Sequence, residues 1–486
     1  MPDLKTLTIK EARKSLDAKE YSALELTDAY LVAISERNPE IHAYLEVWEK
    51  TAREEAKKAD EMIARGESLP LTGIPIAVKD NILIEARTAS AGSKILENYK
   101  ATYDAAVITK LKNQGAVFLG RTNMDEFALG SSTENSAYGP TKNPHDTSRV
   151  PGGTSGGSAA AVAAGMALAA LGSDTGGSIR QPSAYCGVSG LKPTYGAVSR
   201  FGLIATASSL DQIGTIGKTV VDAQLLFDGV RGYDKNDSTS LPNSPRSDLE
   251  NPKGRTLRIG IPRAFLKGGV DADVLSAFEK TLESLRTKGY EIKDIKLFDD
   301  PQIPLAVYYI INPAEVSTNL ARFDGIRYGL SVPASNIQEV YAKTRGVGFG
   351  PEVRRRILVG TFVLSSGYAD AYYRKALAVR EIIRADFART FSAGGGSSFG
   401  GESVDAIVTP TTPGPAFKFG EKSDPLAMYL EDIFTVPVNL AGVPAISVPM
   451  GTVAREGRDL PVGFQIIGAH GDEETLFAIG KDIEAT

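Results

Sequence analysis

The sequence predicts an α/β fold in which helices and strands alternate along the chain. Short apolar runs such as GIPIAVKDN (73–81) and DAIVTPTTP (405–413) are typical of buried strands, and amphipathic helical patterns lie between them. The composition agrees, because a 486-residue chain with 42% hydrophobic and 23% charged residues can bury a large core. Alternation of this kind favours a layered α/β architecture.

The chain begins with a helical region. Apolar residues recur at helix-like intervals through residues 7–67, and Ser22 with Glu25 forms a capping-box pattern at a helix start. Residues 52–65 (AREEAKKADEMIAR) predict a second, charged helix that ends at Gly66. We expect this part of the chain to pack as helices beside the sheet.

A strand and a helix–turn–strand unit follow. The apolar run at 73–81 predicts a buried strand with Lys79 at its end. Residues 105–120 predict a helix, a turn at Gly115 and a further strand. Glycine-rich segments then crowd together between residues 130 and 202, and this part of the chain holds most of the unusual chemistry.

A polar, Pro-rich segment at 232–254 predicts a surface linker. Beyond it, residues 271–288 form a capped amphipathic helix pattern, and residues 352–388 read as one long helical region rich in Arg and Tyr. The low-complexity run 392–401 predicts a surface loop. The expected strands of this half lie at residues 256–262, 405–413, 444–451 and 461–468.

Bulk properties exclude several classes of protein. The net charge of −5 gives no basic excess for direct binding of nucleic acid. The single cysteine, Cys186, excludes an intrachain disulfide and a cysteine-rich metal site. The start has no apolar signal-peptide core, and the small and apolar run 159–172 is shorter than the roughly 20 residues that cross a bilayer. We therefore expect a cytoplasmic protein.

Histidine is scarce, and this limits the kinds of catalytic site that the chain can hold. Only His42, His145 and His470 are present, and none lies in a glycine-rich, catalytic-looking context. A Ser-His-Asp triad would need one of them. We expect all three to be ordinary surface or loop residues, and we expect no metal site.

Three features between residues 79 and 182 carry candidate chemistry, and each has a plain explanation on its own. Lys79 could be a solvated lysine paired with Asp80. PGGTSGGS (151–158) could be an anion-binding loop at a helix N-terminus, although it matches neither the Walker nor the dinucleotide-binding spacing. The TGGS within SDTGGSIRQP (173–182) could be a tight turn.

Taken together, these features indicate a serine nucleophile that works without histidine. A serine hydroxyl needs an adjacent base, and a neutral lysine can replace histidine in that role. A lysine at the end of the apolar strand IPIAVK is placed for desolvation, which lowers a lysine pKa. Glycines such as Gly176 and Gly177 allow successive N–H groups to converge on one oxyanion.

These segments resemble the amidase signature family. GIPIAVKDN, PGGTSGGSAAAVAAG and GSDTGGSIRQPSAYCGVSGLKPTYG match the family's lysine, its Gly/Ser-rich loop and its GGSIR-x-P motif in order and spacing. The resemblance extends over nearly the whole chain and favours members that work in tRNA-dependent amidotransferases. The supporting segments outside the signature are residues 123–144, 322–329, 348–376 and 435–451.

The resemblance implies a central mixed β-sheet covered by helices on both faces, and it implies roles for the residues of the signature. Lys79 would be the base, Ser178 the acylated nucleophile, and Thr154 the bridging hydroxyl, held in the family by a cis peptide. The oxyanion hole would be formed by backbone amides, those of Thr175, Gly176 and Gly177 together with that of Ser178.

The resemblance also implies three residues that bind the α-amino and α-carboxylate groups of glutamine: Tyr309, Arg356 and Asp432. The chemistry is suitable, because arginine grips a carboxylate as a fork and aspartate pairs with an ammonium group. Arg354 and Arg355 are alternatives for the arginine. Each of the three assigned residues could instead be structural, as a surface charge or a core aromatic.

The sequence departs from the family pattern at two places. Position 154 is threonine where the family has serine, which keeps a hydroxyl but adds a methyl group to a crowded site. The Gly/Ser-rich insertion at 392–401 precedes a predicted strand, and we expect it to have no catalytic role.

The resemblance implies a glutaminase that supplies ammonia for the conversion of Glu-tRNA(Gln) to Gln-tRNA(Gln), and in some members of Asp-tRNA(Asn) to Asn-tRNA(Asn). It implies a heterotrimer with the B and C subunits of the amidotransferase, in which the B subunit holds the tRNA and the complex uses ATP and Mg²⁺. We expect no cofactor in this chain, no membrane association and one amidase domain over residues 1–486. That domain would comprise a helical region (1–70), a signature core (71–220), the linker and a remainder that completes the sheet and the glutamine pocket.

Three other interpretations stay open at this point. The chain could be a free-standing amidase of the same family that acts on another amide. It could be an inactive binding paralogue in which Thr154 is the lesion. Residues 151–158 could bind phosphate.

Overall fold

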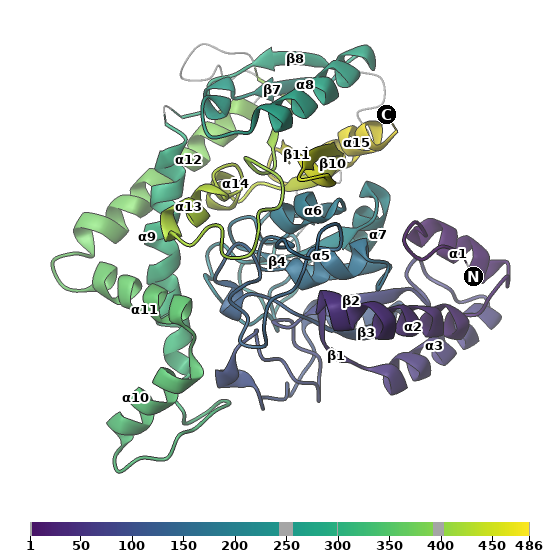
Figure 1. The fold of residues 1–486 in the computed structure, drawn as a ribbon, viewed down its shortest axis with the longest axis horizontal. Helices are drawn as coiled ribbons and strands as arrows, with labels where there is room; N and C mark the ends of the chain where they lie inside the picture. Colours follow the sequence, from purple (N-terminus) through teal and green to yellow (C-terminus); the bar gives the residue numbers. More distant parts are fainter. Residues whose placement is uncertain (1, 243–255, 299, 392–402, 486) are drawn as a thin grey trace.

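The described residues form one mixed sheet of 11 strands (Figure 1). The computed structural model describes residues 2–242, 256–298, 300–391 and 403–485. The strand order is β1-β3-β2-β4-β6-β5-β10-β11-β9-β7-β8, with parallel pairs at β2/β3, β2/β4, β7/β8 and β7/β9. The strands are β1 (Tyr44–Val47), β2 (Pro75–Lys79), β3 (Val117–Thr122), β4 (Ala169–Asp174), β5 (Ser189–Lys192), β6 (Gln212–Gly217), β7 (Arg258–Ile261), β8 (Glu291–Asp294), β9 (Ala406–Pro410), β10 (Ala445–Arg455) and β11 (Arg458–Gly468).

Every residue of the central strands β2, β4, β5 and β6 is buried. Both faces of the sheet are therefore covered, as expected for a sheet with helices on either side. The α/β prediction is therefore confirmed. The helices are α1 (Ile9–Asp17), α2 (Ala23–Ile41), α3 (Glu49–Ala64), α4 (Ala106–Asn113), α5 (Gly156–Ala163), α6 (Arg180–Cys186), α7 (Val220–Val230), α8 (Ala272–Thr287), α9 (Gln302–Asn319), α10 (Ile337–Gly348), α11 (Pro351–Leu364), α12 (Lys375–Phe391), α13 (Pro425–Leu430), α14 (Val436–Ala441) and α15 (Glu473–Glu484).

Strands from both sides of the predicted linker join the same sheet. β6 precedes the linker and β7 follows it, and β10 connects the two parts by pairing with β5 on one side and β11 on the other. Residues 243–254 of the linker and the predicted loop at 392–401 lie outside the described residues. The shared sheet supports the single-domain interpretation, which stays a prediction.

The N-terminal helices form largely as expected. Ser22 and Glu25 make both bonds of a capping box, with the Glu25 N–H donating to Ser22 Oγ at 3.1 Å. One element was missed, since the helical region contains the strand β1. β1 is a four-residue edge strand with little alternation, and its antiparallel pairing with β3 determines its conformation.

Two further expectations need correction. The long helix predicted for residues 352–388 is broken, because Ser365 is extended and Gly367 has φ +84° between α11 and α12. A five-residue π-helical turn then leads into α12. Asp271 lies at the N-cap of α8 without a side-chain cap bond, since its carboxylate binds Arg455 at 2.6 Å.

Helices α9, α10 and α11 form an arm along one side of the molecule, at the left of Figure 1. α9 and α11 pack so closely that a Cβ on Gly360 would collide with the Pro313 carbonyl oxygen. This packing places side chains of the two helices beside one another. None of the helices in the described ranges is both long and apolar enough to cross a membrane.

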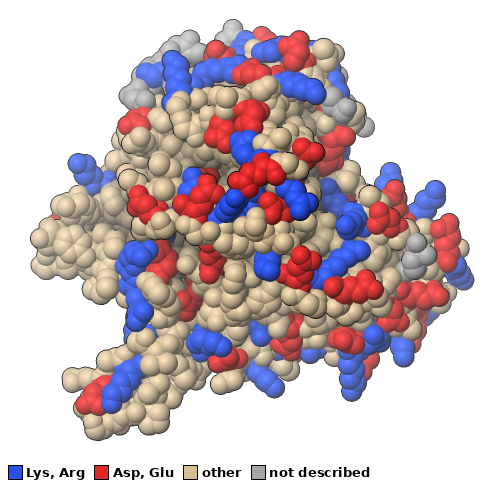
Figure 2. Space-filling view, in the orientation of Figure 1, with Lys and Arg blue, Asp and Glu red and all other residues tan. Residues whose placement is uncertain are grey.

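Charges of both signs are interspersed over the face seen in Figure 2. On the described residues of that face, neither sign gathers into one large patch.

Candidate active site

Lys79 is the buried centre of the candidate site. It ends β2, between the parallel strands β3 and β4, and its side chain has no exposed surface. Its Nζ donates to Thr154 Oγ1 at 2.8 Å, to Ser155 Oγ at 2.7 Å and to Ser173 Oγ at 2.9 Å. Burial lowers the pKa of Lys79 to about 7, so a large neutral fraction exists near neutral pH. The expected desolvation is confirmed.

Thr154 and Ser155 reach the lysine from the glycine-rich loop before α5. Gly152 has φ +84° and Gly153 has φ +51°, and a Cβ on either would collide with the α6 side chains of Tyr185 or Pro182. These glycines therefore allow the close packing that directs the two hydroxyls inward. Both hydroxyls contact Lys79, so geometry alone does not single out Thr154.

Threonine at position 154 fits the site. The residue is fully buried, and its hydroxyl still binds Lys79. All peptide bonds in the described residues are trans, so the cis peptide that the resemblance implies at Thr154 is not present. The extra methyl group of threonine is thus compatible with the bond to the lysine.

The phosphate-binding interpretation of residues 151–158 is not supported by the geometry. The first residues of α5 are completely buried, and the Gly156 N–H already donates to Thr133 Oγ1 at 3.2 Å. An anion-binding helix start needs accessible N–H groups. The glycines instead pack against other parts of the chain.

Ser178 lies in a turn between β4 and α6 that is braced by an ion pair. Asp174 accepts hydrogen bonds from the N–H groups of Gly177 (2.9 Å) and Ile179 (3.1 Å). Arg180 binds both oxygens of Asp174, at 3.0 and 3.1 Å. Burial opposes the charge of Asp174, but Arg180 holds the pKa of its carboxyl well below the usual range. The turn is therefore fixed before any substrate arrives.

Sequence reasoning missed the roles of Asp174 and Arg180. The available signal was a pair of opposite charges on either side of TGGS in a segment that is otherwise small and apolar. A buried charge of this kind needs a partner, and the other member of the pair is the nearest candidate.

The candidate oxyanion hole has one donor that is already engaged. The Gly177 N–H donates to Asp174, so the remaining candidates are the amides of Thr175, Gly176 and Ser178. A Cβ on Gly176 would lie 2.7 Å from Tyr308 Oη, which explains the requirement for glycine there. Thr175 Oγ1 also donates to Asp211 at 2.7 Å, and this bond fixes the start of the turn.

A backbone hydrogen bond holds the loop of Thr154 next to the turn of Ser178. The Ser155 N–H donates to the Ser178 carbonyl at 3.1 Å, which joins the glycine loop to the seryl turn. Ser178 keeps 8% exposure whereas Thr154 has none, so Ser178 is the more accessible of the two. Within the described residues, no side chain hydrogen-bonds the Ser178 hydroxyl, and the Thr154–Ser178 contact of the expected relay is not formed.

The three residues expected to bind glutamine come together from distant parts of the chain. Tyr309 Oη donates to Asp432 Oδ2 at 3.3 Å, and the Arg356 guanidinium carbon lies 4.7 Å from the Tyr309 ring centre. Arg356 is buried, whereas its rivals Arg354 and Arg355 are exposed, so Arg356 is the arginine that faces the site.

Burial raises the pKa of Asp432 to about 7, while a bond from Ser131 Oγ (2.6 Å) favours its charged form. A cavity of about 260 Å³, lined by Ser131, Arg356 and Tyr429 among others, opens beside these groups. Arg356 lines this cavity, and Asp432 lies behind its wall, where it binds the lining residue Ser131. A guanidinium and a carboxylate so close together can bind the carboxylate and ammonium groups of an amino acid.

Helix α9 links this cavity to the seryl turn. Its Asn312 accepts from Arg356 Nη1 at 3.3 Å and donates to Tyr308 Oη at 3.4 Å, and Tyr308 lies against Gly176. Thr435 makes a second link, since its hydroxyl donates to the carbonyls of Gly176 (2.6 Å) and Asp432 (3.1 Å). Sequence reasoning missed Asn312, whose signal was a lone amide in an apolar helical run.

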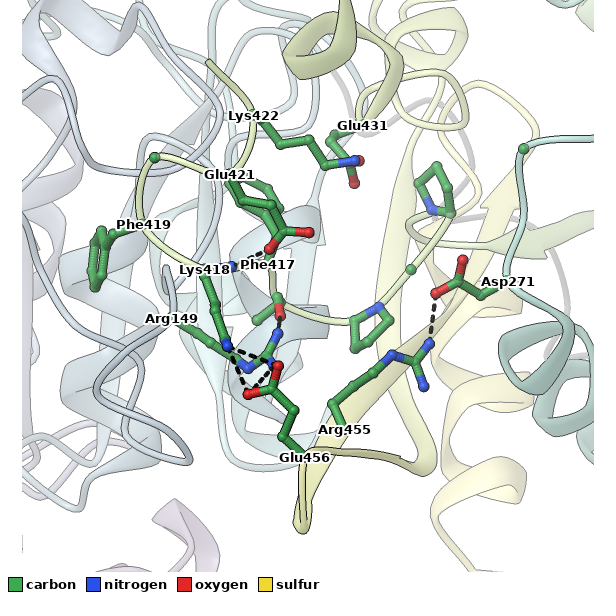
Figure 3. Close-up of a pocket in the computed structure, with 16 residues that line it drawn as sticks. Arg149, Asp271, Phe417, Lys418, Phe419, Glu421, Lys422, Glu431, Arg455 and Glu456 are labelled. Atoms are coloured by element: carbon green, nitrogen blue, oxygen red, sulfur yellow. Dashed lines mark hydrogen bonds and ion pairs between the residues drawn. The ribbon is translucent and has the colours of Figure 1, made fainter. Parts of the chain in front are cut away.

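A larger groove of about 660 Å³ lies beyond the loop that precedes α13 (Figure 3). Its charges are paired with one another: Lys418 with Glu456 at 2.7 Å, and Lys422 with Glu431 at 2.8 Å. Glu431 also accepts from Tyr185 Oη at 2.9 Å. These pairs hold the loop in place next to Asp432 and leave the groove without an excess of charge.

The histidines do not contribute to the candidate site. His42 Nδ1 lies 3.2 Å from the Pro140 carbonyl and His145 Nε2 lies 3.0 Å from the Cys186 carbonyl, while His470 follows β11. In the described ranges no group of three or more His, Cys, Asp or Glu side chains is arranged to hold a metal ion.

The chain is similar to known proteins over nearly its whole length. The Amidase family model matches residues 25–477. The chain belongs to the amidase family. The A subunit of glutamyl-tRNA(Gln) amidotransferase from Carboxydothermus hydrogenoformans is 51% identical over 495 residues, covering 99% of this chain and 97% of that protein. The protein of the same name from Methylacidiphilum infernorum is 52% identical over 487 residues, covering 99% of this chain and 94% of the relative.

Solved structures agree with this assignment to the amidase family. The crystal structure of the A subunit of glutamyl-tRNA(Gln) amidotransferase from Thermotoga maritima has a TM-score of 0.80 at 41% identity, over 100% of this chain and 96% of that one. The peptide amidase from Stenotrophomonas maltophilia has a TM-score of 0.79 at 27% identity, over 99% and 96% of the two chains. The amidase fold is therefore shared by relatives with different named substrates.

Proposed function

We propose that this chain is the glutaminase (A) subunit of a glutamyl-tRNA(Gln) amidotransferase. The observation that carries the proposal is the buried Lys79, with its pKa near 7, bonded to Thr154 beside the braced turn of Ser178. Relatives of that name are 51% and 52% identical to this chain over 99% of its length, and this similarity favours glutamine as the substrate over other amides.

In the proposed reaction, neutral Lys79 takes the proton of Thr154, which takes the proton of Ser178. Ser178 Oγ forms a bond to the side-chain amide carbon of glutamine, and the backbone amides of the turn stabilise the oxyanion. The relay then returns a proton to the leaving nitrogen, the C–N bond breaks, and ammonia leaves. Water attacks the acyl ester in the same way, which releases glutamate and restores Ser178.

This relay needs a hydrogen bond between the Thr154 and Ser178 hydroxyls, which the described residues do not form. Catalytic hydrogen bonds are often long in free enzymes and tighten when substrate binds. Ser155 also contacts Lys79, at 2.7 Å, and it is the alternative bridging hydroxyl. We assign the relay to Thr154 because it matches the family's position.

For substrate binding, we assign Arg356 to the α-carboxylate of glutamine and Asp432, with Tyr309, to its α-amino group. The contacts that join these three residues, and the cavity of about 260 Å³ that Arg356 lines beside them, support this assignment. A pocket of this kind suits an amino acid, because both charged ends find a partner of opposite sign.

The remaining parts of the proposal concern the complex. The relatives' name implies assembly with further subunits, and we propose that these are the B and C subunits of a cytoplasmic heterotrimer. Ammonia would pass to the B subunit, where the complex uses ATP and Mg²⁺ to activate the tRNA-linked glutamate. The B subunit would also hold the tRNA, since the net charge of this chain is −5.

The decisive experiment is co-expression with candidate B and C subunits, followed by assays of glutamine-dependent transamidation and ammonia release. The intact complex should release ammonia from glutamine, and the Lys79→Ala and Ser178→Ala complexes should release none above background. Activity in both variants would refute the assigned triad. Turnover of other amides but not glutamine would indicate a free-standing amidase, and a folded but inert complex would indicate a binding paralogue.

A further inference from the structure

We propose that Tyr429 and Glu352 are positioning residues that hold the Arg356 guanidinium ready for a carboxylate, and that they select α-amino-acid amides over amides lacking that carboxylate. The inference depends on the proposed function, because it specifies how the same cavity recognises its substrate. Nothing in the sequence resemblance pointed to either residue.

Glu352 sets the rotation of the guanidinium from one side. It lies four residues before Arg356 on α11, and its Oε1 accepts from Arg356 Nε at 2.7 Å. Asn312 Oδ1 lies 3.3 Å from Nη1, and in the described part of the chain no acceptor binds Nη2. Arginine presents its N–H groups as a rigid fork, so binding at Nε leaves the Nη1–Nη2 edge available to a carboxylate.

Tyr429 restrains the same guanidinium through its ring. The Tyr309 and Tyr429 rings are stacked with centres 3.7 Å apart and planes at 21°. The guanidinium carbon of Arg356 is 4.7 Å from one ring centre and 4.9 Å from the other, so it lies beside the stack and contacts both rings. Packing against the two rings restrains the guanidinium, and cation–π attraction adds to this restraint because Arg356 is buried.

The position of Tyr429 in the fold makes it suitable for this role. It lies on α13, a short helix without fully buried residues, whose Leu426 is 62% exposed. The Asp432 N–H donates to the Tyr429 carbonyl at 3.2 Å, so both residues lie on one helical turn. Tyr429 thus joins the arginine assigned to the carboxylate to the residue assigned to the ammonium group, and it is itself only half-buried.

The test compares two substrates that differ only in the α-carboxylate: glutamine and 4-aminobutanamide. In the complex with the B and C subunits, Tyr429→Ala should lower the ratio of their kcat/KM values about tenfold, through KM for glutamine. Glu352→Ala should also lower the ratio of the two kcat/KM values. Tyr429→Phe, which keeps the ring, should stay within about twofold, and so should Tyr341→Ala, a matched change at a 38%-exposed tyrosine on α10.

An unchanged ratio in Tyr429→Ala, or an equal loss with both substrates, would overturn the inference. Failure of the proposed function has a different signature, namely no ammonia from glutamine in the unaltered complex. In that case the inference is tested by calorimetry, which measures the affinity of the protein for glutaramate, a ligand that has the carboxylate. Weaker binding to Tyr429→Ala than to the unaltered protein supports it, and equal or absent binding to both refutes it.

Discussion

The relay region and the substrate-binding region of this molecule are built in opposite ways. Lys79, Thr154 and Ser178 lie in strand ends and glycine turns of one half of the chain, with exposures from 0 to 8%. The residues assigned to substrate binding come from α9, α11 and the turn after α13, and one of them, Arg356, lines a cavity. The first region is fixed by backbone geometry, whereas the second consists of long side chains restrained by their neighbours.

This difference separates two kinds of effect. Changes in the relay region should lower kcat, because its groups act on the reacting atoms. Changes in the binding region should raise KM, because its groups contact the unreactive end of the substrate. Hydrogen bonds of Asn312 and Thr435 connect the two regions and set the distance between them, but we assign neither residue a role in the reaction.

The largest expected effect is at Lys79. Lys79→Met should lower kcat for ammonia release about 10⁴-fold, since the relay loses its base. Lys192 is a matched control, because burial lowers its pKa to about 7 as well, yet its Nζ donates to the Pro193 carbonyl. Lys192→Met should keep more than about a tenth of the activity. Equal losses in two folded variants would mean that a buried lysine, not this relay, is required.

The next effect tests the bridging hydroxyl. Thr154→Val keeps the shape but removes the oxygen, and kcat should fall about 10²–10³-fold. Thr154→Ser keeps the hydroxyl and should match or exceed the activity of the unaltered protein. A large loss in Thr154→Ser would show that the methyl group is specifically needed, and a loss confined to Ser155→Ala would move the relay to Ser155.

A smaller effect is expected in the substrate-binding region. Arg356→Ala should raise KM for glutamine about 10²-fold with a modest change in kcat, because the charged hydrogen bonds to the carboxylate are lost. Arg354→Ala, an exposed neighbour on the same helix, should change KM less than about twofold. Steady-state kinetics of the two variants decide the assignment, and a drop in kcat alone for Arg356→Ala would contradict it.

The smallest effect is a change in the pH dependence. Lys79 must be neutral to act as base and Asp432 must be charged to bind an ammonium group, and both have a pKa of about 7. Activity is therefore lost as the pH falls through that value, and log(kcat/KM) should approach a slope of about two on the acid side. In Asp432→Asn the slope should be about one. If the slope is the same in Asp432→Asn, titration of Asp432 does not contribute to the pH dependence of kcat/KM.

The two regions also differ in how well the sequence predicts them. Glycines mark the turns at residues 151–158 and 173–182, so the segments that hold the proposed relay could be found from local patterns, whereas the role of each residue was implied by the family resemblance. Arg356 could not be separated from its two neighbours by pattern alone, because only packing against α9 buries it. Glu352 and Tyr429 gave no local signal, and the signal of Asn312 was only a lone amide in an apolar run. The partners of these residues are remote in the chain or depend on the turn of one helix.

The sequence by itself determined the alternation of helices and strands, the buried strand that ends in Lys79 and the family to which the chain belongs. Hydrophobic period and glycine placement are local properties, which is why they could be read directly. The tertiary structure alone decided the 11-strand order, the break between α11 and α12, the trans peptide at Thr154 and the cavity beside Arg356. These features depend on which remote surfaces bury one another, and contacts between distant segments carry no signature in a single sequence.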